Sequence, residues 1–80
     1  MTYEDCAAEG ERLAQSFPVH QRPKAKAMIA ALAQFHAQLD IVERCPKCGE
    51  LLAVREEGSA ARVRHVSCPC GECADVIPGF

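Results

Sequence analysis

The spacing of apolar residues along the chain changes near residue 45. Before that point, apolar positions recur every three or four residues over 3–16 and again over 23–43, which is the period of an amphipathic helix. Pro18 and Pro23 separate the two segments, and Pro23 suits the first turn of a helix. We therefore predict two helices, over 3–16 and 23–43, that pack as an antiparallel hairpin. The second carries an unbroken heptad series of apolar residues: Ala25, Met28, Leu32, Phe35, Leu39 and Val42.

Three positions bear on how this hairpin packs. Gly10 lies in the middle of the first predicted helix, where a glycine costs about 1 kcal/mol relative to alanine. We favour a close contact between the helices at Gly10 over a merely weakened helix. Because the first helix is the shorter one, the heptad series near Leu39 and Val42 needs a further cover. The C-terminal half of the chain is one candidate, and a second copy, which would make a homodimer through the second helix, is the other.

From residue 45 onward the pattern indicates β-strands. Residues 51–55 and 62–67 favour strands, and the polar residues between them are typical of a turn. A short apolar stretch over 74–77 can add a third strand, which Pro78 would end. The sequence thus predicts an α+β protein, in which an N-terminal helical hairpin, 1–44, precedes a β-hairpin module with a short C-terminal tail, 45–80.

Cysteines give the C-terminal module its chemistry. Five of the six cysteines lie between residues 45 and 73. Cys45 and Cys48 stand in the turn-forming sequence Cys-Pro-Lys-Cys-Gly, a spacing that lets two thiolates bind one metal ion. The other half of a tetrahedral site must come from Cys68, Cys70 and Cys73. We expect Cys70 and Cys73, which repeat the first spacing, to be the ligands, and a pair of Cys68 with either of them is the alternative.

The size of the chain and its first residues favour a metal over disulfides as the stabilising element. A chain of 80 residues buries a modest share of its surface and usually needs such a staple. The first residues lack the basic start and apolar run of a secretory signal, and no apolar stretch is long enough to span a membrane. We therefore expect a cytoplasmic protein with reduced cysteines.

This arrangement of cysteines around a β-hairpin resembles the zinc-ribbon family, in which two knuckles at the base of a hairpin hold one zinc ion. The resemblance implies one structural Zn²⁺ per chain. A helical hairpin followed by a four-cysteine module is also similar in architecture to the TraR/DksA family of polymerase-binding regulators, with Cys45, Cys48, Cys70 and Cys73 as the ligands. The two leucines after the first knuckle loosely resemble the phage Com-type translational regulators. These likenesses imply a role in gene expression.

The charge pattern bears on nucleic-acid binding. The formal net charge is −2, so the chain lacks the positive charge of a general nucleic-acid binder. A local basic edge remains on the predicted hairpin and could contact phosphates: Lys47, Arg55, Arg62 and Arg64. No Phe, Tyr or Trp lies between residues 36 and 79, so base stacking is not available to these residues.

The residues favour a binding role over catalysis. Four thiolates around one ion leave no open position for water, and no arrangement of serine, histidine and acid indicates a nucleophile, so we expect no enzymatic activity. Our leading interpretation is a non-catalytic regulatory or adaptor module that acts through protein contacts. The alternatives are a homo-oligomer through the second helix and a nucleic-acid-binding ribbon. A rubredoxin-like electron carrier is least favoured, because such proteins pack aromatic residues around the metal.

Overall fold

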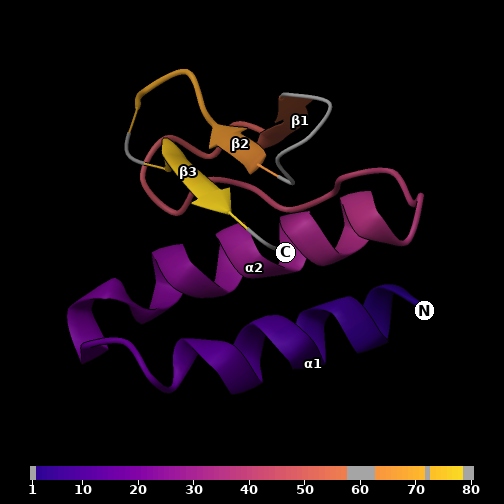
Figure 1. Cartoon of the computed structure of the whole chain (residues 1–80). Helices are drawn as coiled ribbons and strands as arrows, with labels where there is room; N and C mark the ends of the chain where they lie inside the picture. Colours follow the sequence, from indigo (N-terminus) through magenta and orange to yellow (C-terminus); the bar gives the residue numbers. More distant parts are fainter. Residues whose placement is uncertain (1, 58–62, 72, 79–80) are drawn as a thin grey trace.

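The computed structural model of the chain describes residues 2–57, 63–71 and 73–78. Two helices, α1 (Tyr3–Ala14) and α2 (Arg22–His36), are joined by a turn that contains the short 3₁₀ helix η1 (Val19–Gln21). Three strands follow: β1 (Ala53–Glu57), β2 (Val63–Ser67) and β3 (Asp75–Pro78). Figure 1 shows α2 between α1 on one side and the sheet on the other. The predicted α+β class, with a helical hairpin before a β-hairpin, is confirmed.

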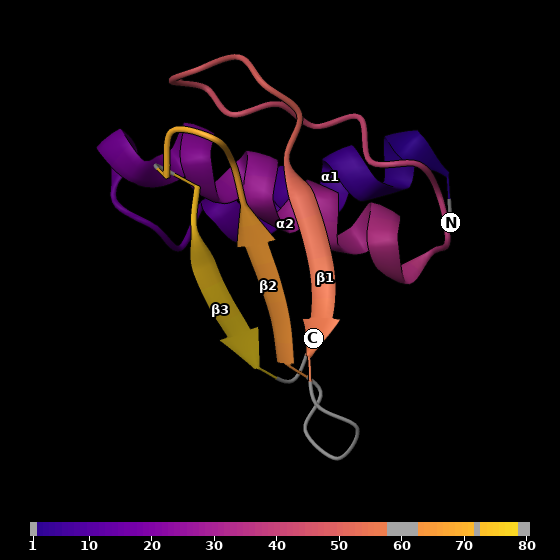
Figure 2. The ribbon, with the colours of Figure 1, turned by 90° about the horizontal axis from the view of Figure 1, so that it is seen from above.

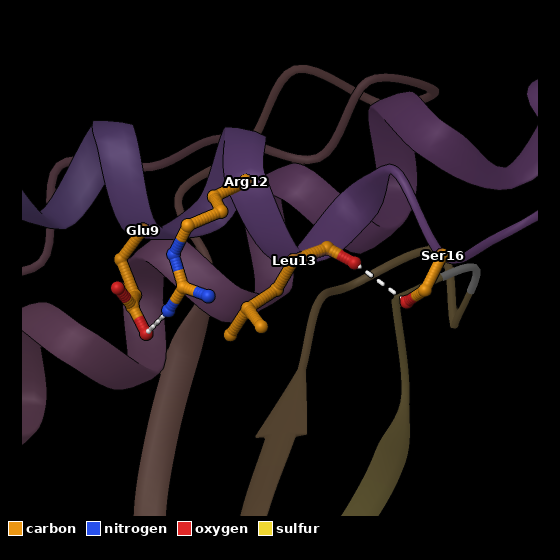
Figure 3. A network of polar contacts seen from close by, with 4 residues as sticks. All are labelled: Glu9, Arg12, Leu13 and Ser16. Atoms are coloured by element: carbon orange, nitrogen blue, oxygen red, sulfur yellow. Dashed lines mark hydrogen bonds and ion pairs between the residues drawn. The ribbon is translucent and has the colours of Figure 1, made fainter.

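Helix α1 begins at a capping box. The backbone N–H of Asp5 donates to Thr2 Oγ1 at 3.2 Å, and the backbone N–H of Thr2 donates to an Asp5 carboxylate oxygen at 3.0 Å. These bonds hold the pKa of Asp5 below its ordinary value. Beyond the end of the helix, the Ser16 hydroxyl donates to the Leu13 carbonyl at 2.8 Å (Figure 3). The two ends of α1 are therefore satisfied by side chains close in sequence.

The close contact predicted at Gly10 is confirmed. A Cβ atom placed on Gly10 would lie 2.7 Å from the Lys26 carbonyl oxygen of α2 and 3.2 Å from the Ala30 Cβ. Gly10 is buried, and Ala30, its neighbour on α2, carries only a methyl group. The missing side chain therefore allows the two helices to approach closely along their middle turns.

Helix α2 ends at His36, well before the predicted end at 43. Gln38 adopts a left-handed conformation with φ of 62°. The N–H of Gln38 donates to the Phe35 carbonyl at 3.1 Å, and the N–H of Leu39 donates to the Gln34 carbonyl at 2.9 Å. These two bonds form a Schellman motif, in which the chain turns away from the helix axis. Leu39 and Val42 consequently lie in the segment that leaves the helix.

This connecting segment is tied back to α2 through Gln34. The Gln34 side chain is buried, and its Nε2 donates to a Glu43 carboxylate oxygen at 2.9 Å. The backbone N–H of Val42 donates to Gln34 Oε1 at 3.0 Å. A buried amide that is satisfied on both sides fixes the path of the chain toward Cys45.

The sheet packs on the face of α2 opposite α1. Its strand order is β1-β2-β3, and both neighbouring pairs are antiparallel (Figure 2). The predicted third strand is therefore present as β3. One core cluster joins the two halves of the chain and contains the following buried residues: Ala27, Met28, Ala31, Leu32, Cys45, Leu52, Val66 and Cys73. The ribbon covers the heptad series at Met28 and Leu32, whereas Val42, where a further cover was expected, remains 51% exposed.

Neither α-helix in the described part of the chain has the length and apolar character that crossing a bilayer requires.

Candidate metal centre

The first cysteine turn has the backbone of a metal knuckle. The N–H groups of Lys47 and Cys48 donate to the Cys45 sulfur at 3.4 and 3.5 Å. Gly49, with φ of 75°, donates its N–H to the Cys45 carbonyl at 2.9 Å and closes the turn. Glycine fits this position because a side chain would strain the left-handed backbone. The N–H of Cys45 donates in turn to the Glu50 carbonyl at 2.9 Å, which fixes the base of the knuckle.

The second turn is a shortened copy of the first. Gly71, with φ of 79°, donates its N–H to the Cys68 carbonyl at 3.0 Å, as Gly49 does to Cys45. The sequence Cys68-Pro69-Cys70-Gly71 has one residue fewer between its sulfurs than the first turn. The N–H of Cys73 donates to the Cys68 sulfur at 3.4 Å, as the N–H of Cys48 does to the Cys45 sulfur in the first knuckle.

Both turns lie at the same end of the sheet. The first precedes β1 and the second follows β2, and the register pairs Ala53 at the start of β1 with Ser67 at the end of β2. The segment after α2 runs back over the helices to reach this end (Figure 2). The pairing of β1 with β2 therefore brings the two cysteine groups together, although they are far apart in sequence.

Four sulfurs converge there. The Sγ atoms of Cys45, Cys48, Cys68 and Cys70 all lie within 4.8 Å of one another. The Cys45 and Cys70 sulfurs are 3.6 Å apart, and those of Cys68 and Cys70 are 3.4 Å apart. Four thiolates at a Zn–S distance of about 2.3 Å around a tetrahedral ion would be separated by about 3.8 Å. The four sulfurs are therefore close enough together to hold one metal ion.

The group of four contains Cys68 with Cys70, which was the alternative to the expected pair of Cys70 and Cys73. Cys73 is completely buried and belongs to the shared core, while Cys70 is exposed. Cys70 and Cys73 were expected as ligands because they are separated by the same number of residues as Cys45 and Cys48. The signal for Cys68 lay in the proline and glycine, because Cys-Pro-Cys-Gly repeats Cys-Pro-Lys-Cys-Gly with one residue removed.

The backbone around the cluster favours the thiolate form of two cysteines. The N–H groups of Cys48 and Lys47 lower the pKa of the Cys45 thiol to about 6. The N–H of Cys73 likewise lowers the pKa of Cys68. Burial, together with the nearby Cys45 and Cys68 sulfurs, raises the pKa of Cys73 to about 12. The backbone N–H groups therefore favour the thiolate at Cys45 and Cys68, while burial favours the neutral thiol at Cys73.

The predicted basic edge is divided in the structure. Arg64 is only 7% exposed, its guanidinium lies over the Phe35 ring at 5.5 Å, and its Nη1 is 3.4 Å from a Glu56 carboxylate oxygen. Lys47 and Arg55 are exposed, and Arg62 lies outside the described residues. Arg64 faces α2 because it lies two residues before the buried Val66, and residues two apart on a strand share one face of the sheet. A phosphate contact by Arg64 would therefore require the side chain to leave the interior.

Comparisons with protein-family models, curated proteins and solved structures found no match for this chain. The geometry of the cluster and the surface around it therefore carry the functional argument.

Proposed function

We propose that Cys45, Cys48, Cys68 and Cys70 hold one Zn²⁺, and that the chain is a non-catalytic binding module stabilised by this metal. The observation that carries the proposal is the convergence of four sulfurs within 4.8 Å at the end of the β-hairpin. Four thiolates in a tetrahedral arrangement suit zinc, and a fully occupied coordination sphere has no position for a reactive water. The zinc-ribbon likeness of the two knuckles supports the same assignment.

The metal would act as a structural staple. The residues between α2 and β1 form no helix or strand longer than the single bridge between Arg44 and Leu51. A bound ion would join this segment to the turn after β2 at two points. Because Cys45 also packs against Leu52 and Val66 in the shared core, loss of the ion would loosen the contact between the sheet and α2.

Surface features favour a protein over a nucleic acid as the partner. Two large apolar side chains beside the first knuckle remain exposed, Val42 at 51% and Leu51 at 48%. Of the basic residues that could contact phosphates, Arg64 is turned inward. The heptad series of α2 is already buried within the chain at Ala25, Met28 and Leu32. Less of its apolar surface therefore remains for contact with a second copy of the protein. A target in the gene-expression machinery rests on the family resemblance alone.

A cobalt titration tests the metal site. Co²⁺ bound by four thiolates gives intense visible and charge-transfer bands, so we expect one equivalent of Co²⁺ to saturate the spectrum and Zn²⁺ to displace it. Cys48→Ser should abolish the four-thiolate spectrum. Cys6→Ser is the matched control, because Cys6 is buried in α1 outside the group of four. Equal spectra for the Cys48 variant and the parent, or no bound Co²⁺ in the parent, would contradict the proposal.

A further inference from the structure

Five cysteines gather at a site that needs four. The fifth, Cys73, stands outside the group of four close sulfurs, yet its backbone N–H donates to the Cys68 sulfur. We propose that Cys73 is a resident substitute ligand, which takes the place of Cys70 at the metal when Cys70 is chemically modified. The inference rests on the proposed zinc site, and it adds that this site has two complete ligand sets.

Cys70 occupies the solvent side of the cluster. It is the exposed member of the four, while Cys45 is 2% exposed and Cys48 and Cys68 are half-buried. It stands in the turn between Pro69 and Gly71. An alkylating agent in water would therefore reach Cys70 before the other three ligands.

Cys73 occupies the core side of the same cluster. Its side chain is 0% exposed and packs with Leu52 and Val66. Its backbone N–H lies 3.4 Å from the Cys68 sulfur, and its side chain belongs to the same buried cluster as Cys45. Cys73 therefore contacts Cys68 through its backbone and packs in the same cluster as Cys45, two of the three ligands that would remain if Cys70 were lost.

The exchange keeps the ligand charge constant. With iodoacetamide as the reagent, the Cys70 thiolate attacks the methylene carbon, a carbon–sulfur bond forms, and the carbon–iodine bond breaks as iodide leaves. The resulting thioether is a neutral and weaker zinc ligand. Cys73 then gives its thiol proton to water and binds the metal as a thiolate, so that four thiolates again surround Zn²⁺. No electron is transferred in either step.

The experiment follows metal and modification in the same molecule. Zinc-loaded protein is treated with a limited amount of iodoacetamide, native mass spectrometry records the zinc content of the singly modified species, and peptide mapping locates the modification. We expect modification at Cys70 with zinc retained in the parent, and zinc loss at the same degree of modification in Cys73→Ser. Zinc loss from the parent after modification of Cys70 alone would overturn the inference.

Matched variants give a second readout that does not depend on the reagent. Cys70→Ser changes an exposed residue and should keep one Zn²⁺ with an affinity within about tenfold of the parent, as expected when the number of thiolate ligands is unchanged. Adding Cys73→Ser should then weaken zinc binding by a further factor of about 100, roughly one ligand's share of a structural site. If Cys70→Ser alone loses zinc as Cys48→Ser does, the inference is wrong. If the parent binds no zinc, the proposed site itself fails.

Discussion

Replacement of Gly10 by alanine gives a quantitative test of how the helices pack. The added methyl carbon would lie 2.7 Å from the Lys26 carbonyl oxygen, well inside the normal separation of about 3.5 Å. The obstacle is a backbone atom of α2, so it cannot rotate away as a side chain could. A second contact, at 3.2 Å from the Ala30 Cβ, resists the same movement. Relief of the overlap therefore requires the two helices to separate.

Two opposing effects determine the size of the change. Alanine in the middle of a helix is favoured over glycine by about 1 kcal/mol. Overpacking of a tight contact costs about 1–3 kcal/mol, and a backbone obstacle places this site in the upper part of that range. We expect Gly10→Ala to lower the free energy of unfolding by about 1–2 kcal/mol. For a domain of this size the melting temperature would fall by about 4–16 °C.

The assay is denaturant unfolding followed by circular dichroism, with the zinc concentration held constant, because bound metal adds to stability. Ala8→Gly provides the matched control, since Ala8 is exposed on the same helix and reports helix propensity alone. That control should cost about 1 kcal/mol. If Gly10→Ala instead raised the free energy of unfolding by a similar amount, the close approach of the helices at this position would be refuted.

Two further changes test the ends of the helices. Gln38→Gly should raise the free energy of unfolding by about 1 kcal/mol in the same denaturation assay, because glycine adopts the left-handed conformation without the strain that glutamine bears; no gain would contradict the Schellman ending of α2. Thr2→Ala should cost about 1 kcal/mol through loss of the capping box. Because the folded pKa of Asp5 is lowered, its contribution is present above its ordinary value of 3.8 and is lost as pH falls through the lowered pKa. The difference between Thr2→Ala and the parent should shrink in acid only by the part that the Thr2 hydroxyl contributes, because alanine keeps the backbone N–H that lowers the pKa of Asp5 most. A difference that grows in acid would argue against this cap.

The helices and the ribbon could be predicted from the sequence because their periods differ. The 3.6-residue period and the prolines located α1 and the start of α2, and the β pattern located the strands. The end of α2 could not be located in this way. Gln38 takes a left-handed conformation in which glycine is the usual residue, and the apolar series continued through Leu39 and Val42 as though the helix did.

The candidate site was predictable in composition more than in geometry. The sequence indicated that Cys45 and Cys48 would meet two of the three later cysteines, but spacing alone could not show that Cys68 lies in the close group while Cys73 is buried in the core. The inward direction of Arg64 could have been predicted, because Arg64 lies two residues from the apolar Val66 and therefore on the same face of the strand. We instead interpreted its charge as a sign of exposure. Its cation is accommodated by Phe35 of α2, far away in sequence, and by Glu56, its register partner on β1.

The most direct test of the account is native mass spectrometry of the protein purified without reductant. We predict one zinc ion per chain, with every remaining thiol reduced and the ion lost only when a chelator or acid is added. A metal-free chain that is lighter by the hydrogens lost in disulfide formation would contradict the central claim. The converging sulfurs would then have to be explained as redox chemistry and not as a metal site.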